Sequence, residues 1–510
     1  MAIRFGRRSL SRRQFLTCAA LASAGALAGA GMGCAPAAPP AAPSAPVAAS
    51  SPPAAAAPQA TAVPAAAAPT APPGAPKPAT IIDFLKEAAK PFKGAEVSFL
   101  AHNANTTKDI EPLFPKFTEA TGIKLKPTYL GEAETLTKID LDLSSGGGAF
   151  DAILTFYSNI PRYARGQWLE PVAQYIDDSK LTSKEIWKPE DFFEGAKREM
   201  SYQGVLYAAP MFQATQIFYY RKDIFQQNGI DKAPDTFDDL LAVLERIHNK
   251  PVAAIALRSA RGSSMNVWNW TAWLMAYGGA WFKSYDPKSP DYLRPAFDTP
   301  EAAKATELYA NVIQKFSPAG ATNWGWVEAS RSFKVKQTAM IQEGSPFGSQ
   351  FMDPAQSEVA DEKLLGCFLI PKGPKGRFSN RGAQGWSVSK FSKRKEPAWL
   401  FITWATAIET WKESTIALPN STVPRNSLWT WEPFLKKYGW GNYLETVRLA
   451  MENSGDYPVY TPPIPEYKDV GDEVSARLQQ VIAGQRPAAE AMKEANQVVD
   501  KIMKDAGYYK

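Results

Sequence analysis

Residues 202–241 read YQGVLYAAPMFQATQIFYYRKDIFQQNGIDKAPDTFDDLL, and the chain continues as AVLERIHN to Asn249. Thr236 and Asp239 have the spacing of a capping box, in which two side chains satisfy free backbone N–H groups at the start of a helix. The apolar residues that follow share one stripe of a 3.6-residue repeat: Phe237, Leu240, Leu241, Leu244 and Ile247. The pattern predicts an amphipathic helix that begins at Phe237.

Strand and helix signals alternate on both sides of this stretch. AEVSFLAH (95–102) and FDAILTFY (150–157) are typical of short buried strands, and IEPLFPKFTEATG (110–122) of a helix with Gly122 as its C-cap. Thr299 and Pro300 have the residue types of an N-cap and a first helical position. Alternating strands and helices indicate an α/β architecture.

The expected folded part, residues 79–510, is too long for one core of ordinary size, and its length favours two lobes. The formal net charge of the whole chain is +6, but five of the positive charges are arginines within residues 1–34. The remaining chain is close to neutral, which removes the electrostatic basis for nucleic-acid binding.

Cysteine and histidine are scarce. The cysteines are Cys18, Cys34 and Cys367, and the histidines are His102 and His248. With one cysteine in the expected folded part, neither a disulfide framework nor a cysteine metal site is predicted. The sequence indicates no metal site and no cofactor.

Aromatic residues are abundant, with 15 Trp, 19 Tyr and 26 Phe, and many of them adjoin Gly, Ser, Asn or Pro. Aromatic surfaces in such loops are typical of proteins that bind sugars or other flat, amphipathic ligands.

Five segments together resemble the extracellular solute-binding proteins of ABC importers, of the maltose-binding type, and they occur in that family's order. They are residues 113–129, 150–172, 202–241, 332–350 (SFKVKQTAMIQEGSPFGSQ) and 385–406 (GWSVSKFSKRKEPAWLFITWAT). One departure is that Lys336 or Gln337 replaces the glycine that usually precedes the TAM segment.

The resemblance implies a two-lobed periplasmic-binding-protein fold of type II with a multi-crossing hinge. Two α/β lobes then close on a ligand. The implied partners are a small-molecule solute, expected to be a carbohydrate, and the permease subunits of an ABC importer. No bond is broken, and the protein is expected to be a monomer. The implied crossings lie near 208–210, 340–344 and 376–384. The implied N-lobe is about 90–208 plus 341–378, and the C-lobe about 211–338 plus 385–510.

Candidate site residues follow from the needs of a sugar, which stacks its ring on aromatic faces and hydrogen-bonds its hydroxyls to polar groups. The resemblance places Trp268 at the position of a stacking aromatic, with Asn266 two residues earlier as a partner for a hydroxyl group. Phe347 stands where the family has a stacking tryptophan. Trp324, Trp326 and Trp386 are further candidates for the cleft wall, because each adjoins glycine or polar residues.

Polar candidates lie after the predicted strands, where α/β proteins bind ligands. They are Asn103 and Asn105 after the first strand, and Tyr157, Ser158 and Asn159 after the strand that ends at Phe156. Gln213 in the expected hinge and Arg425 in the C-lobe complete the set.

The N-terminus has the features of an export signal. Ser11 to Leu16 resembles the twin-arginine consensus, with Arg12 and Arg13 as the pair, and Cys34 stands where a lipoprotein signal would be cleaved and lipidated. Of the 44 residues from Ala35 to Pro78, 34 are Ala or Pro, which favours an extended tether over a core. We expect a signal peptide at 1–34, a disordered tether at 35–78, and an exported protein that is lipid-anchored at the outer face of the cytoplasmic membrane or in the periplasm.

Two alternatives stay open at this point. The same fold binds a polyol, a phosphate ester or a polyamine in place of a sugar, or the chain is a secreted glycoside hydrolase. A hydrolase needs two carboxylates about 5 to 10 Å apart, and no segment resembles a hydrolase motif.

Overall fold

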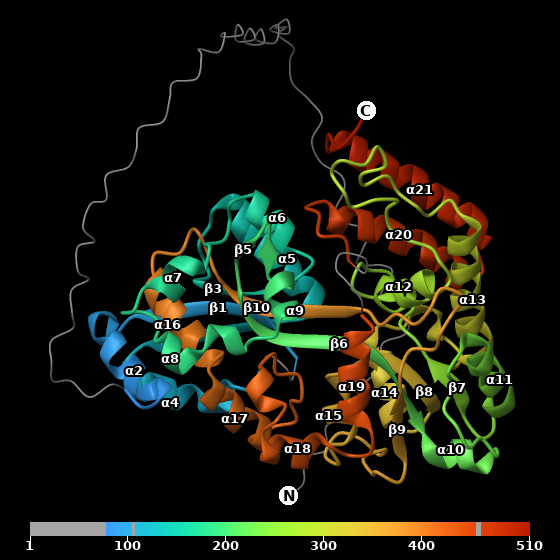
Figure 1. Ribbon diagram of the computed structural model, residues 1–510, viewed down its shortest axis with the longest axis horizontal. Coiled ribbons are helices and arrows are strands. Elements are labelled where there is room, and N and C mark those ends of the chain that lie inside the picture. Colours follow the sequence, from blue (N-terminus) through green and yellow to red (C-terminus); the bar gives the residue numbers. More distant parts are fainter. Residues whose placement is uncertain (1–77, 105–107, 455–460) are drawn as a thin grey trace, which may run out of the picture. The chain divides into compact units, whose positions relative to one another are not determined.

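Strand β6 (Ala209–Arg221) joins two halves of the central sheet (Figure 1). The computed structural model describes residues 78–104, 108–454 and 461–510. The first part of β6 pairs antiparallel with β10 (Arg381–Val388), from Ala209 to Thr215. Its second part, from Gln216 to Arg221, pairs with β8 (Thr338–Gly344) and β9 (Leu365–Phe368). Nearly all of its side chains are buried, as in a strand covered on both faces.

The strand order is β2-β1-β3-β10-β6-β8-β7, with β9 beside β6. The remaining strands are β1 (Glu96–His102), β2 (Lys124–Leu130), β3 (Ala152–Phe156), β7 (Ala253–Ala256) and the small hairpin β4 (Ser201–Tyr202) and β5 (Val205–Leu206). We call β2, β1, β3, β10 and residues 209–215 the first half-sheet. The second half-sheet consists of residues 216–221, β8, β9 and β7.

Helices surround both half-sheets. Those of the chain up to residue 247 are α2 (Ile81–Ala88), α4 (Phe114–Thr121), α5 (Glu132–Ser145), α6 (Ile160–Arg165), α7 (Ala173–Asp177), α8 (Lys184–Trp187), α9 (Glu194–Glu199), α10 (Lys222–Gln227) and α11 (Phe237–Ile247). The later ones are α12 (Asn266–Ala276), α13 (Pro300–Phe316), α14 (Trp326–Lys334), α15 (Phe347–Phe351), α16 (Lys395–Ala405), α17 (Ile408–Ala417), α18 (Glu432–Tyr438), α19 (Tyr443–Glu452), α20 (Tyr467–Ile482) and α21 (Ala488–Asp505).

The local sequence signals are confirmed where the structure describes them. Thr236 and Asp239 form both bonds of a capping box at the start of α11. The Thr299 side chain accepts from the Ala302 N–H in the first turn of α13, whose first residue is Pro300. Gly122 ends α4 in the left-handed conformation, with φ of 71°. Each signal depends on residues within one turn, so tertiary contacts were not needed to predict it.

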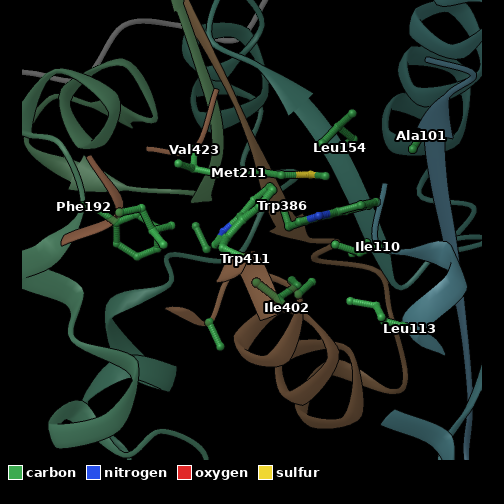
Figure 2. Close-up of a cluster of buried hydrophobic side chains, with 14 of the residues drawn as sticks. Ala101, Ile110, Leu113, Leu154, Phe192, Met211, Trp386, Ile402, Trp411 and Val423 are labelled. Atoms are coloured by element: carbon green, nitrogen blue, oxygen red, sulfur yellow. The ribbon is translucent and has the colours of Figure 1, made fainter. Parts of the chain in front are cut away.

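The first buried cluster extends over both half-sheets, from Leu154 and Trp386 to Ile217 and Ile341, and a second cluster lies on the second half-sheet. Figure 2 shows part of the first, in which Trp386, Trp411 and Met211 lie among aliphatic side chains. The second cluster joins α11, α12 and α13 to α20 and α21. Figure 1 shows α11 and α13 near β7, and α20 and α21 pack against α13. Burial of these side chains is the main stabilising contribution to the fold.

The segments divide between the half-sheets differently from the expected lobes. Residues 338–344 and 365–368, expected to lie largely in the N-lobe, pair with the second part of β6. Residues 385–388, expected in the C-lobe, pair with β3, and α16 packs on the first half-sheet. Fully buried strands have the same apolar pattern in either half, so the sequence did not show which neighbours they pair with.

In the part of the chain that the structure describes, no helix has the length and apolar character needed to cross a bilayer. Within the same residues, no cluster of His, Cys, Asp or Glu is suited to a metal ion. The expected signal peptide, Cys34 and the tether lie outside the described residues.

Candidate ligand-binding cavity

A cavity of about 180 Å³ lies where the two half-sheets meet. Phe212 and Ala214 of β6 and the segment 382–384 of β10 form its base. Loops after the carboxyl ends of β1 and β3 contribute from one side, and α12, α20 and the loop after β8 from the other. Ligands of α/β proteins bind at such strand ends, because the loops there vary without disturbing the sheet.

Several predicted aromatic residues line this cavity: Trp268, Trp326, Phe347 and Tyr157. Trp326 and Phe347 meet edge to face with ring centroids 6.0 Å apart. The indole Nε1 of Trp268 is buried and has no hydrogen-bond partner among the described residues. The cavity therefore offers the flat apolar surfaces on which the carbon face of a sugar or polyol packs.

The predicted turn after β3 also reaches the cavity. Ser158 and Asn159 line it, and the Ser158 hydroxyl donates to Asn159 Oδ1 at 3.2 Å. The Tyr157 hydroxyl lies 2.9 Å from Thr461 Oγ1. Position after a buried strand was the signal that located these three residues.

Three predicted residues lie elsewhere. Trp386 is fully buried and packs edge to face on Phe99 in the first cluster, so it is a core residue (Figure 2). Asn266 is fully buried, and both ends of its amide bond to Ser475. Trp324 is half-buried, packs against the first cluster and does not line the cavity. An aromatic or amide side chain has the same sequence signature in a core as in a cleft.

The remaining predicted residues also lie outside the cavity lining. Asn103 is exposed, although the neighbouring Ala104 lines the cavity. Asn105 lies outside the described residues. Gln213 is buried and supports Glu199 instead of a ligand.

Arg425 has a structural position. It is fully buried, donates to the carbonyl oxygens of Thr406 and Lys188, and stacks 3.6 Å from the ring centroid of Phe192. Burial lowers its pKa to about 9. These carbonyl oxygens satisfy the donors of the buried guanidinium, as is usual for buried polar groups.

Charged and polar residues that the sequence did not single out also line the cavity: His102, Glu132, Arg258, Gln350, Gln384 and Lys468. His102 Nε2 lies 3.1 Å from Gln384 Oε1. Burial lowers the pKa of His102, which the nearby charge of Glu132 opposes. No local motif marks these residues, because tertiary folding alone brings them together.

Arg258 and Glu343 form a buried ion pair beside the cavity. Arg258 Nε donates to the two carboxylate oxygens at 2.8 and 2.9 Å, and Nη2 also donates to Glu343. The Glu343 side chain is fully buried, and burial raises its pKa, whereas the charge of Arg258 acts in the opposite direction. The guanidinium carbon lies 5.8 Å from the ring centroid of Trp268.

Polar contacts cross the boundary between the halves around the cavity. The Ser264 hydroxyl donates to Glu132 Oε1 at 2.7 Å, and Arg165 pairs with Glu466 at 2.6 Å. Together with the contact between Tyr157 and Thr461, they join loops of the first half to segments that pack on the second. These contacts bound the cavity between two parts of the chain.

Comparison with known proteins agrees with this architecture. Residues 103–410 match the family described as bacterial extracellular solute-binding protein. The mannitol-binding protein of Pseudomonas aeruginosa is 27% identical over 445 residues, covering 82% of this chain and 95% of that protein. The erythritol/L-threitol-binding protein of Mycolicibacterium smegmatis is 24% identical, covering 80% of this chain and 86% of its own length.

Among solved structures, an ABC transporter solute-binding protein of Agrobacterium vitis with bound D-mannitol superimposes with a TM-score of 0.72. It is 24% identical, and the match covers 82% of this chain and all of that one. The chain belongs to the bacterial extracellular solute-binding protein family. The expected α/β fold of the maltose-binding type is confirmed.

Proposed function

We propose that this protein is the substrate-binding component of an ABC importer and captures a small, neutral, polyhydroxylated solute, with a polyol or monosaccharide as the first choice. The observation that carries the proposal is the cavity at the half-sheet boundary, where aromatic rings and polar side chains face one small volume. Relatives named for mannitol and for erythritol or threitol support it.

The cavity volume bears on the size of the solute. At about 180 Å³ it is smaller than the roughly 300–1,000 Å³ typical of pockets for drug-sized ligands. This favours a single sugar unit or an acyclic polyol over an oligosaccharide. A phosphate ester or a polyamine on the same fold remains the alternative for the solute.

Binding without chemical conversion is the second part of the proposal. Among the described residues that line the cavity, Glu132 is the single acidic one, and the nearby Glu343 is held by Arg258. A glycoside hydrolase needs two carboxylates in the roles of acid and base or nucleophile. Incubation with oligosaccharides should therefore release no new reducing ends, and their appearance would favour the hydrolase.

A ligand panel tests the solute class. The purified protein is heated with erythritol, ribitol, D-mannitol, D-glucose, maltose, glycerol 3-phosphate or putrescine, and the unfolding midpoint is recorded. A ligand at 100 times its dissociation constant stabilises a protein by about 2.7 kcal/mol, so one of the polyols or the monosaccharide should raise the midpoint by several degrees. A rise with the phosphate ester or putrescine alone would contradict the proposal.

We further propose that residues 79–510 form the solute-binding domain and act as a monomer whose two lobes close on the solute. Strand β6 runs continuously between the half-sheets and is suited to act as part of the hinge. The closed form would then be the one that the permease of the importer recognises.

Export and anchoring by the N-terminal segment complete the proposal. Replacement of both Arg12 and Arg13 by lysine should leave precursor in the cytoplasm, and unchanged export would contradict a twin-arginine signal. Cys34→Ala should release the protein from the membrane fraction. Recovery of the unaltered protein in soluble form, with its N-terminus inside residues 35–78, would contradict lipid anchoring.

A further inference from the structure

The Arg258 guanidinium reaches the cavity with part of its hydrogen-bonding capacity unused. A guanidinium has five N–H bonds. Nε–H and one N–H of Nη2 are directed to Glu343, and one N–H of Nη1 donates to the Ser264 carbonyl oxygen at 2.9 Å. Within the described residues, these contacts leave one N–H on each terminal nitrogen.

Glu343 fixes the orientation of this group. Its carboxylate is fully buried and binds one edge of the guanidinium through both oxygens. The guanidinium carbon also lies over the ring of Trp268, 5.8 Å from its centroid. A planar cation held at one edge by a carboxylate loses little further freedom when a ligand binds, so the remaining donors are pre-organised.

The charged side chains around the cavity carry no net positive charge. Glu343 compensates Arg258, and Asp472 accepts from Lys468 at 3.4 Å. Glu132 lines the cavity and accepts from the neutral hydroxyl of Ser264. With His102 favoured in its neutral form by burial, these groups leave no net positive charge for an anionic ligand.

We propose that Arg258, held by Glu343, is a specificity-determining residue that donates its two remaining N–H groups to adjacent hydroxyl oxygens of a neutral solute, and that its pairing with Glu343 excludes solutes bearing a carboxylate or phosphate. The inference rests on the proposed function, because it concerns the solute of the same cavity. Two adjacent hydroxyl oxygens of a solute match the two free N–H groups on the terminal nitrogens of Arg258. A carboxylate or phosphate would need a cation whose charge is not already compensated, and Glu343 compensates the charge of Arg258.

Two probes that differ at one terminal carbon test this inference: D-mannitol, which ends in a hydroxymethyl group, and D-mannonate, which ends in a carboxylate. Dissociation constants are measured by calorimetry for the full-length mature protein. The unaltered protein should prefer mannitol by about 100-fold, since a buried anion without a counter-charge is strongly disfavoured.

Glu343→Gln keeps the shape of the side chain and removes its charge. The variant should bind mannitol more weakly and mannonate more tightly, so that the preference for mannitol narrows by about 10-fold or more. If Glu343 had a structural role alone, the substitution would weaken the binding of mannitol and of mannonate equally. An unchanged ratio of the two dissociation constants would overturn the inference.

Glu199→Gln is a matched control. Glu199 is also buried and paired, with Arg381 Nε at 2.6 Å, but neither residue lines the cavity. This control should leave the ratio of the two dissociation constants within about two-fold, because sites without shared contacts act independently. The same narrowing in Glu199→Gln as in Glu343→Gln would also overturn the inference.

Arg258→Lys provides a second variant if Glu343→Gln does not fold. Lysine keeps the positive charge and loses the planar fork, so mannitol binding should weaken by about 10-fold or more. Undiminished mannitol binding by this variant would overturn the inference. An unaltered protein that binds mannonate as tightly as mannitol refutes the inference alone, whereas one that binds no sugar or polyol refutes the proposed function with it.

Discussion

Replacement of Trp268 by alanine separates a role in ligand binding from a role in folding. Trp268 is half-buried on α12, and its ring lines the cavity. Its backbone carbonyl accepts from Gln216 Nε2 at 2.6 Å and from Asn380 Nδ2 at 3.1 Å. Alanine keeps both of these bonds, so the substitution removes the indole ring and its contact with Arg258 and little else.

The structure sets the expected magnitudes. Truncation of an aromatic residue at the centre of a binding site costs about 2 to 4 kcal/mol, which weakens binding by about 30- to 1,000-fold. Because the ring already borders a cavity, its loss enlarges existing space instead of opening a closed core. The free energy of unfolding without ligand should therefore fall by about 1 to 2 kcal/mol, less than the 3 to 5 kcal/mol typical of a buried tryptophan.

Trp270→Ala is the matched control on the same helix. Trp270 is fully buried, and its Nε1 donates to Thr306 Oγ1 at 3.0 Å. This variant should lose about 3 to 5 kcal/mol of stability with nearly unaltered affinity in the folded fraction. Urea unfolding without ligand and calorimetric titration with ligand measure the two quantities. A large stability loss with unaltered affinity in Trp268→Ala would remove Trp268 from the site.

Three further predictions concern other parts of the chain. Burial raises the pKa of Asp109 from 3.8 to about 8. The contribution of this group to the free energy of unfolding is therefore fully present below about pH 4, and it is lost as the pH rises to about 8. Asp109→Asn should flatten the stability profile in that window, and an unchanged profile in urea unfolding would contradict the assignment. Arg165→Ala should weaken ligand binding by less than about five-fold, because the Arg165 side chain is 53% exposed in its pair with Glu466. A loss above ten-fold in titration would show that the pair contributes more than an exposed ion pair does. Cys367 is 2% exposed, and burial raises its pKa to about 12, so it should react with a thiol reagent at pH 8 only after denaturation, and rapid labelling of the native protein would contradict its burial.

The sequence predicted those parts of the site that depend on local order. Tyr157, Ser158 and Asn159 line the cavity because a turn after a buried strand stays at the strand end in the folded protein. The same reasoning selected Asn103, whose side chain is exposed to solvent. The position of a loop in the sequence predicts at which edge of the sheet its residues lie, but it does not predict the direction in which each side chain points.

Aromatic candidates were harder to separate. Trp268 lines the cavity and Trp386 is in the core, although both adjoin small or polar residues in the sequence. Trp386 lies within β10, which is covered on both faces by helices and by the rings around Phe99. The pair of Arg258 and Glu343 was missed for a related reason, since 85 positions separate the two residues and no pattern links them.

The position of the cavity would connect ligand binding to the proposed closure of the two lobes. Phe212 and Ala214 of β6 and Gln384 of β10 line it, and β6 also joins the half-sheets, so the cavity adjoins the strand that we propose as part of the hinge. Glu132 and Ser264 make their cross-boundary bond at the same place. A hydrogen bond to a charged group contributes about 1.5 to 3 kcal/mol net, so in the proposed motion this bond favours the closed form over an open form that lacks it. In the proposed motion, a solute that contacts both halves binds the closed form more tightly than the open one, so its occupancy of the cavity shifts the population toward the closed form.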